Sequence, residues 1–279
     1  DYALIFGNWG LPRMGVEGAA WATFVALSAG TFTQAWVFFT RRYRESYNTL
    51  SGWYFDWPSF QRLLRFGLPV GLQFQMQVFA WTLFVLLIGR IGVAALTAHS
   101  IAMNVFMIMV MPVTGMSIAV SVLVGQRLGA GDLASAERVT YSSIHLSLAF
   151  FAIAGLMLVT QPNWFIAPFV QGMTPDIYAS TIPLVDDLLS IVAIFCLFEA
   201  VSMMMAGALK GAGDTFFVAW VGILCSWLVL VLPTALLGYL WGGSLLWSWI
   251  FFLLSGFAMC LVHWLRFKTA KWKHLRITV

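Results

Sequence analysis

Seven long runs of hydrophobic residues, separated by shorter polar stretches, divide this chain. The runs cover residues 18–40, 63–89, 93–125, 135–160, 182–208, 215–241 and 244–266. Each is about as long as the roughly 20 residues that an α-helix needs to cross a bilayer, or longer. The pattern therefore predicts an all-α polytopic membrane protein with seven transmembrane helices.

The composition agrees with a chain whose solvent is lipid. Hydrophobic residues make up 61% of the chain and charged residues only 9%, with a mean hydropathy of +0.88. A soluble domain carries about 25% charged residues, because its surface faces water. The three cysteines lie inside hydrophobic runs, which favours small buried side chains over a disulfide framework or a metal site.

The basic residues predict the orientation of the spans. If successive loops alternate between the two sides, thirteen of the fifteen Lys and Arg residues fall on one side, and only Arg13 and Arg90 fall on the other. The positive-inside rule places the basic side in the cytoplasm. We therefore expect a multi-pass protein of the plasma membrane, the inner membrane of a bacterium, with a cytoplasmic C-terminus.

The segment 41–61 is polar, basic and aromatic, unlike the short connections elsewhere. Aromatic residues alternate with polar ones near Trp53, and Asp56-Trp57-Pro58-Ser59 is typical of a helix start. We expect a short amphipathic helix on the cytoplasmic interface that leads into the second span. The chain begins at Asp1, without an initiating Met or a signal peptide, so we expect it to be a fragment of a longer protein.

One ionisable residue is predicted to lie near the middle of the membrane. Glu199 precedes the basic Lys210 by eleven residues, or roughly 16 Å along a helix, and half of the hydrocarbon thickness is about 15 Å. A charged side chain there costs about 3 kcal/mol, so it is a functional candidate by default. Glu199 could carry a proton, or bind Na⁺ or a cationic substrate; the alternative is a structural hydrogen bond to a neighbouring helix. Asp186 and Asp187 are expected to cap the outer end of the same helix.

Amide side chains mark one face of the second span. Gln73 and Gln77 are four residues apart, so they share a helical face, and Gln77 also lies near the middle of the membrane. Amides in a row facing lipid would be unfavourable. This face therefore lines a cavity or bonds to a neighbouring helix, and both readings stay open.

The third span carries a stripe of polar and Met residues spaced three or four apart. Its members are Thr97, Ser100, Asn104, Met107, Met111 and Thr114. Thioether side chains repack around ligands of different shapes, so the stripe suits a cavity for varied amphipathic molecules. Ordinary helix packing is the alternative. We expect Pro112 and Pro233 to bend their helices.

No catalytic, metal-binding or nucleotide-binding pattern stands out along the chain. The histidines do not cluster at metal-ligand spacing, and there is no nucleophile constellation or phosphate-binding loop. We therefore expect neither an enzyme nor a cofactor beyond a coupling ion. The expected partners are the lipid bilayer and small molecules, without nucleic acid.

Five segments, in order and at helix ends, match one family. They are Gly7–Thr23, Gly67–Gly71, Ala98–Asn104, Val124–Asp132 and Gly207–Thr215. Together they resemble the multidrug and toxic compound extrusion (MATE) family, and the likeness runs from about residue 5 to 266.

The resemblance implies a remnant of a twelve-helix transporter built from two six-helix lobes. Residues 1–40 would end the N-terminal lobe, 41–61 would bridge the lobes, 62–266 would form the C-terminal lobe, and 267–279 would be a basic cytoplasmic tail. Five helices of the N-terminal lobe are then absent. The implied activity is export of cationic or amphipathic drugs in exchange for Na⁺ or H⁺, by a protein that is monomeric at full length.

The resemblance also bears on the candidate residues. Glu199 lies eight residues before Gly207, where the family has a carboxylate. Many members carry Glu where this chain has Gln77, so a cation site of two carboxylates is not expected here. Glu199 would act alone or with an acid of the absent lobe, and the coupled ion stays open.

Three other classes compete with this interpretation. A lipid-linked precursor flippase of related architecture should carry several cationic residues in its cavity, and the mid-membrane regions here have almost none. A seven-helix receptor or retinal protein should show its own motifs or a Lys inside the last helix, and this chain lacks both. A membrane enzyme should cluster acids or histidines. Resistance to inhibitors would distinguish a drug exporter from the other classes.

Overall fold

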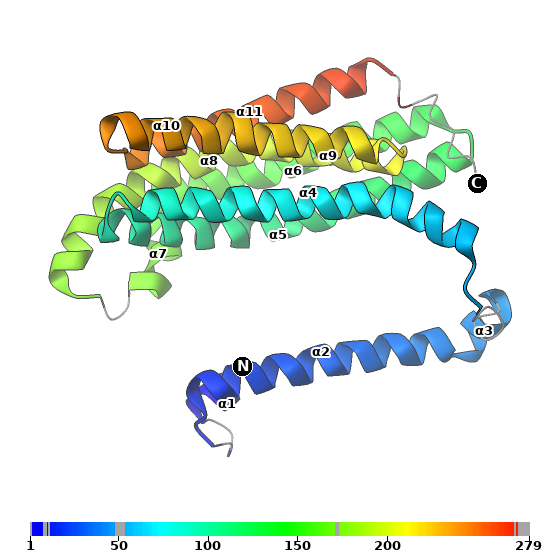
Figure 1. Cartoon of the computed structure of the whole chain (residues 1–279), viewed down its shortest axis with the longest axis horizontal. Coiled ribbons are helices and arrows are strands. Elements are labelled where there is room, and N and C mark those ends of the chain that lie inside the picture. Colours follow the sequence, from blue (N-terminus) through cyan, green and yellow to red (C-terminus); the bar gives the residue numbers. More distant parts are fainter. Residues whose placement is uncertain are drawn as a thin grey trace. The chain divides into compact units, whose positions relative to one another are not determined.

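The computed structural model describes residues 2–7, 10, 12–47, 54–170, 173–270 and 272. Within these residues the regular secondary structure is entirely helical (Figure 1). The chain divides into two compact units, Asp1–Gln61 and Arg62–Val279.

Seven helices of the described residues are long and apolar enough to cross a membrane. They are Gly15–Phe39, Gly71–Gly89, Val93–Gly129, Leu133–Thr160, Pro175–Gly211, Thr215–Gly238 and Leu245–Lys268. The predicted all-α class and the seven predicted spans are confirmed.

The first unit contains one spanning helix between two short ones. Its helices are α1 (Tyr2–Phe6), α2 (Gly15–Phe39) and α3 (Arg41–Tyr47). The side chains of α2 are mostly exposed within this unit, which suits a helix that needs lipid or further protein around it. Of the expected segment 41–61, the structure describes residues 41–47, which form α3, and residues 54–61; Trp53 lies outside the described residues.

The predicted helix start before the second span is confirmed. Helix α4 (Trp57–Gly89) begins at Trp57, and the N–H of Phe60 donates to the carbonyl of Asp56. The rings of Phe55, Trp57 and Phe60 contact one another, with centroids 5.1 to 5.9 Å apart. Aromatic clusters of this kind favour the membrane interface.

The second unit is a bundle of long helices that run side by side (Figure 1). After α4 follow α5 (Val93–Gly129), α6 (Leu133–Thr160), α7 (Pro162–Val170), α8 (Pro175–Gly211), α9 (Thr215–Leu224), the π-helix η1 (Cys225–Val231), α10 (Leu232–Trp241) and α11 (Leu245–Lys268). Helix α8 packs against α5, α6 and α11 and supplies much of the buried core.

Small residues allow α5 and α8 to approach closely. A Cβ atom on Gly207 would lie 2.6 Å from the carbonyl oxygen of Ser117, and one on Gly211 would overlap the backbone of Ser121. The hydroxyl of Ser117 donates to the carbonyl of Met203 at 2.7 Å. Small residues four apart are a common basis of helix packing in membranes, and here they form the central contact of the bundle.

The sixth span changes its helical geometry in the middle. The N–H of Leu232 reaches back five residues to the carbonyl of Trp227, and the π-helix η1 ends just before Pro233. Proline has no N–H and its ring crowds the preceding turn, so a wider turn relieves the conflict. Pro112 lies inside the continuous helix α5.

The expected position of Asp186 and Asp187 is wrong. Helix α8 begins at Pro175, with Thr174 as its N-cap residue and Asp176 in its first turn. Asp186 and Asp187 therefore lie inside the helix, and both are exposed. Hydropathy locates only the apolar part of a helix, and α8 begins seven residues before that part.

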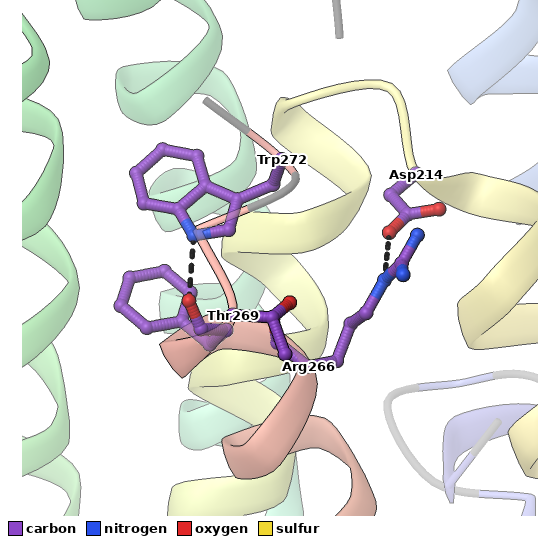
Figure 2. A network of polar contacts seen from close by, with 5 residues as sticks. Asp214, Arg266, Thr269 and Trp272 are labelled. Atoms are coloured by element: carbon purple, nitrogen blue, oxygen red, sulfur yellow. Dashed lines mark hydrogen bonds and ion pairs between the residues drawn. The ribbon is translucent and has the colours of Figure 1, made fainter. Parts of the chain in front are cut away.

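A polar cluster joins the start of α9 to the end of α11 (Figure 2). The Nε atom of Arg266 lies 2.8 Å from Oδ2 of Asp214, and its guanidinium lies 4.6 Å from the ring centroid of Phe217. The indole N–H of Trp272 donates to the carbonyl of Phe267, on whose ring it stacks. The cluster anchors the last residues of α11 to the bundle.

Candidate functional site

Glu199 lies at a cavity of about 360 Å³ inside the second unit. Five helical segments contribute to its lining. Gln77 comes from α4, Met107 from α5, Glu199 from α8, Ser226 from η1 and Ser255 from α11. Three of the sequence-predicted residues, Gln77, Met107 and Glu199, are thus brought together although they come from three different spans.

Aromatic rings form much of the remaining wall. The rings of Phe195 and Phe252 are stacked with centroids 4.0 Å apart, and Phe106 meets Phe195 edge-on at 5.4 Å. Phe74 and Trp81 also belong to this wall. Sequence reasoning missed these rings, because aromatic residues are frequent throughout the chain. Trp81, four residues after Gln77 on α4, could have been found from its helical spacing.

The carboxylate of Glu199 has no hydrogen bond or ion pair with any residue that the structure describes. Its side chain is half-buried at the wall of the cavity. A carboxylate in a membrane interior needs a proton, a cation or a polar partner. The structural alternative, a hydrogen bond to a neighbouring helix, finds no support among the described residues.

The structure separates the two amides that share a face of α4. Gln77 is exposed and lines the cavity of Glu199. Gln73 is buried, and its Nε2 atom lies 2.7 Å from the place of a Cβ on Gly222 in α9. Gln73 is therefore packed between helices and is not among the residues that line this cavity.

The polar and Met stripe of α5 faces outward from the second unit. Ser100, Asn104, Met107 and Met111 are exposed, and Thr97 is half-buried. The polar members bond to their own helix: Thr97 to Val93, Ser100 to Leu96, and Asn104 to Ser100.

Part of this stripe borders a second hollow of about 250 Å³. Ser100, Asn104 and Met107 line it together with Trp81 and His99, and Thr97 and Met111 do not. Met107 and Trp81 also line the cavity of Glu199, so the two hollows share a wall.

This arrangement has the chemistry of a cation site with an apolar surround. One carboxylate, one amide and three hydroxyl groups are set among aromatic rings and thioethers. Aromatic faces attract organic cations, and apolar walls bind the rest of an amphipathic molecule. No group of three or more His, Cys, Asp or Glu residues that could hold a metal ion is found in the described part of the chain.

Comparison with known sequences gives consistent matches. The family model described as MatE matches residues 69–237, which is more than half of the chain. A probable multidrug resistance protein NorM of Mesorhizobium japonicum is 32% identical over 216 residues, covering 77% of this chain and 46% of the relative. The multidrug resistance protein MdtK of Yersinia pseudotuberculosis is 27% identical, covering 87% of this chain and 51% of the relative. This chain spans about half the length of the curated relatives it matches.

Solved structures show the same fold. A crystal structure of MATE in complex with MaL6 superposes with a TM-score of 0.81 at 17% identity, covering 97% of this chain and 59% of that one. The outward-facing conformation of a multidrug resistance MATE family transporter gives a TM-score of 0.81 at 17% identity, covering 99% of this chain and 59% of that one. With the sequence match over more than half of its length, this chain belongs to the MatE family.

Proposed function

We propose that a full-length protein containing this chain exports cationic or amphipathic drugs in exchange for Na⁺ or H⁺. Glu199 is the residue of this chain that binds the coupling cation or the charged part of the drug. The observation that carries the proposal is the carboxylate of Glu199 at an aromatic-walled cavity, without a partner among the described residues. The relatives whose names include multidrug resistance support the substrate class.

The exchange follows from two occupants competing for one charge. A carboxylate that holds a proton or Na⁺ attracts an organic cation less strongly, because opposite charges attract and neutralisation removes that attraction. Movement of one lobe against the other then exposes the cavity to each side in turn. In this scheme Gln77 and Met107 contact the bound drug, and Ser100 and Asn104 extend the contact surface through the neighbouring hollow.

The architecture of the whole transporter belongs to the same proposal. Residues 1–40 end an N-terminal lobe, 41–61 bridge the lobes and 62–266 form the C-terminal lobe, with the C-terminus in the cytoplasm. The basic residue distribution supports this orientation. We propose a monomer in the plasma membrane. The 279-residue chain alone is expected not to transport, because half of the cavity between the lobes would be missing.

The test compares export of ethidium or norfloxacin by the wild type and by Glu199→Gln of the full-length protein in inverted vesicles. Na⁺ and H⁺ gradients are imposed separately, so the effective gradient identifies the coupled ion. We expect Glu199→Gln to abolish coupled export, and Glu199→Asp to keep part of it, because the charge is retained.

Asp186→Asn is the matched control, because Asp186 is an exposed acid on the same helix that does not line the cavity. It should export like the wild type. Wild-type export by Glu199→Gln would contradict the assigned role and would direct attention to acids outside this chain.

A further inference from the structure

Another cavity, larger than that of Glu199, lies at one end of the bundle. Its volume is about 530 Å³, and it shares no lining residue with the cavity of Glu199. Arg90 at its rim follows Gln77 by thirteen residues, which is about 20 Å along a helix. The two cavities are therefore separate sites.

Two turns that contact each other frame this cavity. Gly89 ends α4 and Val93 begins α5, whereas Gly242 and Gly243 follow α10. Both glycines have positive φ angles, of 77° and 83°, and a Cβ on Gly243 would lie 3.3 Å from Cγ1 of Ile91. The cavity opens between these turns, at the end of the membrane-crossing segment Gly71–Gly89.

Arg90 supplies the free positive charge of this cavity. Two ion pairs are found among the described residues, Arg41 with Glu45 and Arg266 with Asp214, and the guanidinium of Arg90 joins neither of them and makes no hydrogen bond there. The hydroxyls of Thr234 and Ser248 also line the cavity, but they donate to the backbone carbonyls of Leu230 and Ser244, four residues earlier. The side-chain donor left for a ligand is therefore Arg90.

The walls next to Arg90 are apolar. Leu87, Ile91, Leu232 and Leu236 line the cavity. Leu232 and Leu236 are half exposed on the outer surface of α10, where hydrocarbon chains would lie. The cavity thus combines one cation at the depth of lipid headgroups with an apolar surface that extends toward the membrane interior.

We propose that this cavity binds an anionic phospholipid, with its phosphate on Arg90 and an acyl chain along Leu232 and Leu236. Arginine binds phosphate oxygens through several N–H groups at once. A free phosphate ion could bind Arg90 in the same way, but it has no acyl chain that would contact the apolar wall. The proposal does not depend on drug transport, because the two cavities are separate.

The experiment measures binding of phosphatidylglycerol to the purified full-length protein in detergent, by native mass spectrometry and by thermal unfolding. Arg90→Gln should weaken binding about fivefold, since one basic residue contributes about that much near an anionic membrane. Arg90→Lys should keep part of the affinity, because it retains the charge but not the forked set of N–H groups. Ala235→Trp should reduce binding by filling the cavity, which Ala235 lines.

Two matched variants control for general effects. Arg13→Gln removes the other basic residue that loop alternation assigns to this side, and Leu240→Trp adds an indole to an exposed position of α10 that is not part of the cavity lining. Both should bind the lipid like the wild type. If Ala235→Trp does not fold, the proposal is tested by comparing the lipid binding of Arg90→Gln with that of Arg90→Lys.

A separate arm replaces the lipid with inorganic phosphate. We expect that inorganic phosphate does not raise the unfolding temperature at concentrations where the lipid does. Equal protection by phosphate would overturn the lipid assignment, as would equal lipid binding by wild type and Arg90→Gln.

Discussion

Asp214 at the start of α9 and Arg266 in the last turn of α11 form an ion pair, with Oδ2 and Nε 2.8 Å apart. The Asp214 side chain is 9% exposed and that of Arg266 is 23% exposed. The acid is placed at a helix N-terminus and the base at a helix C-terminus, which suits both helix dipoles. This pair joins the last two spans through residues that are 52 positions apart in the sequence.

Removing one partner of this pair should destabilise the bundle. We expect Asp214→Asn to lower the free energy of unfolding by about 1–2 kcal/mol, because Arg266 loses a charged acceptor at a partly buried position. Thermal unfolding of Asp214→Asn, Arg266→Gln and the double variant gives the coupling between the two residues. Additive effects of the two single changes would show that the pair contributes nothing.

The glycines of α8 should be sensitive to a single methyl group. Gly211→Ala places a Cβ against the backbone of Ser121, so we expect a loss of about 1–3 kcal/mol from overpacking. Gly129→Ala is the matched control, because a Cβ there meets nothing within 4 Å. Its effect should stay within about 0.5 kcal/mol. Unfolding in detergent measures both, and equal stability of the two variants would contradict the close packing of α5 and α8.

A second carboxylate in the cavity of Glu199 should strengthen cation binding. Gln77→Glu adds a negative charge to a cavity that already holds Glu199, and the two charges together attract a cation more strongly than one. We expect at least a tenfold tighter Na⁺ or organic cation affinity by isothermal titration, corresponding to about 1.4 kcal/mol. Gln73→Glu is the contrasting variant, because Gln73 is packed against α9. Similar gains in both variants would show that the position of Gln77 has no special role.

We predict that the start of α6, outside the membrane-spanning segments, is sensitive to acid. Asp132 is the N-cap residue of this helix. Hydrogen bonds from the side chain and backbone of Ser135 lower the pKa of Asp132 from its ordinary value of 3.8. A lowered folded-state pKa gives stabilisation that is complete above the unfolded-state value and is lost as the pH falls through the folded-state value. This contribution is therefore present at pH 6 and lost below pH 3.8.

Two variants at this position separate charge from capping. Asp132→Asn keeps an N-cap acceptor but cannot titrate, so its stability should depend less on pH between 6 and 3 than that of the wild type. Asp132→Ala should be less stable than Asp132→Asn throughout this range. Unfolding temperatures measured across the pH series provide the test, and identical pH profiles of wild type and Asp132→Asn would contradict it.

The sequence alone was enough to locate the spans and to select Glu199. A run of about 20 apolar residues in lipid must satisfy its own backbone hydrogen bonds, so each run predicts one helix. Glu199 stands out because a carboxylate inside such a run is costly. Both arguments use only local chemistry and the known thickness of a bilayer. The start of α8 at Pro175 was missed, because hydropathy does not report the part of a helix outside the hydrocarbon region.

Only the tertiary structure decided which residues of different helices lie next to each other in the bundle. Gln73 and Gln77 share a helical face, yet Gln73 packs against Gly222 and Gln77 lines the cavity, because α9 covers one turn of α4 and not the next. Likewise, Arg90 lines the same cavity as Leu232 and Leu236 only because two turns that are distant in the sequence lie next to each other. Helical periodicity says which residues share a face, and it does not say which neighbour, cavity or lipid that face meets.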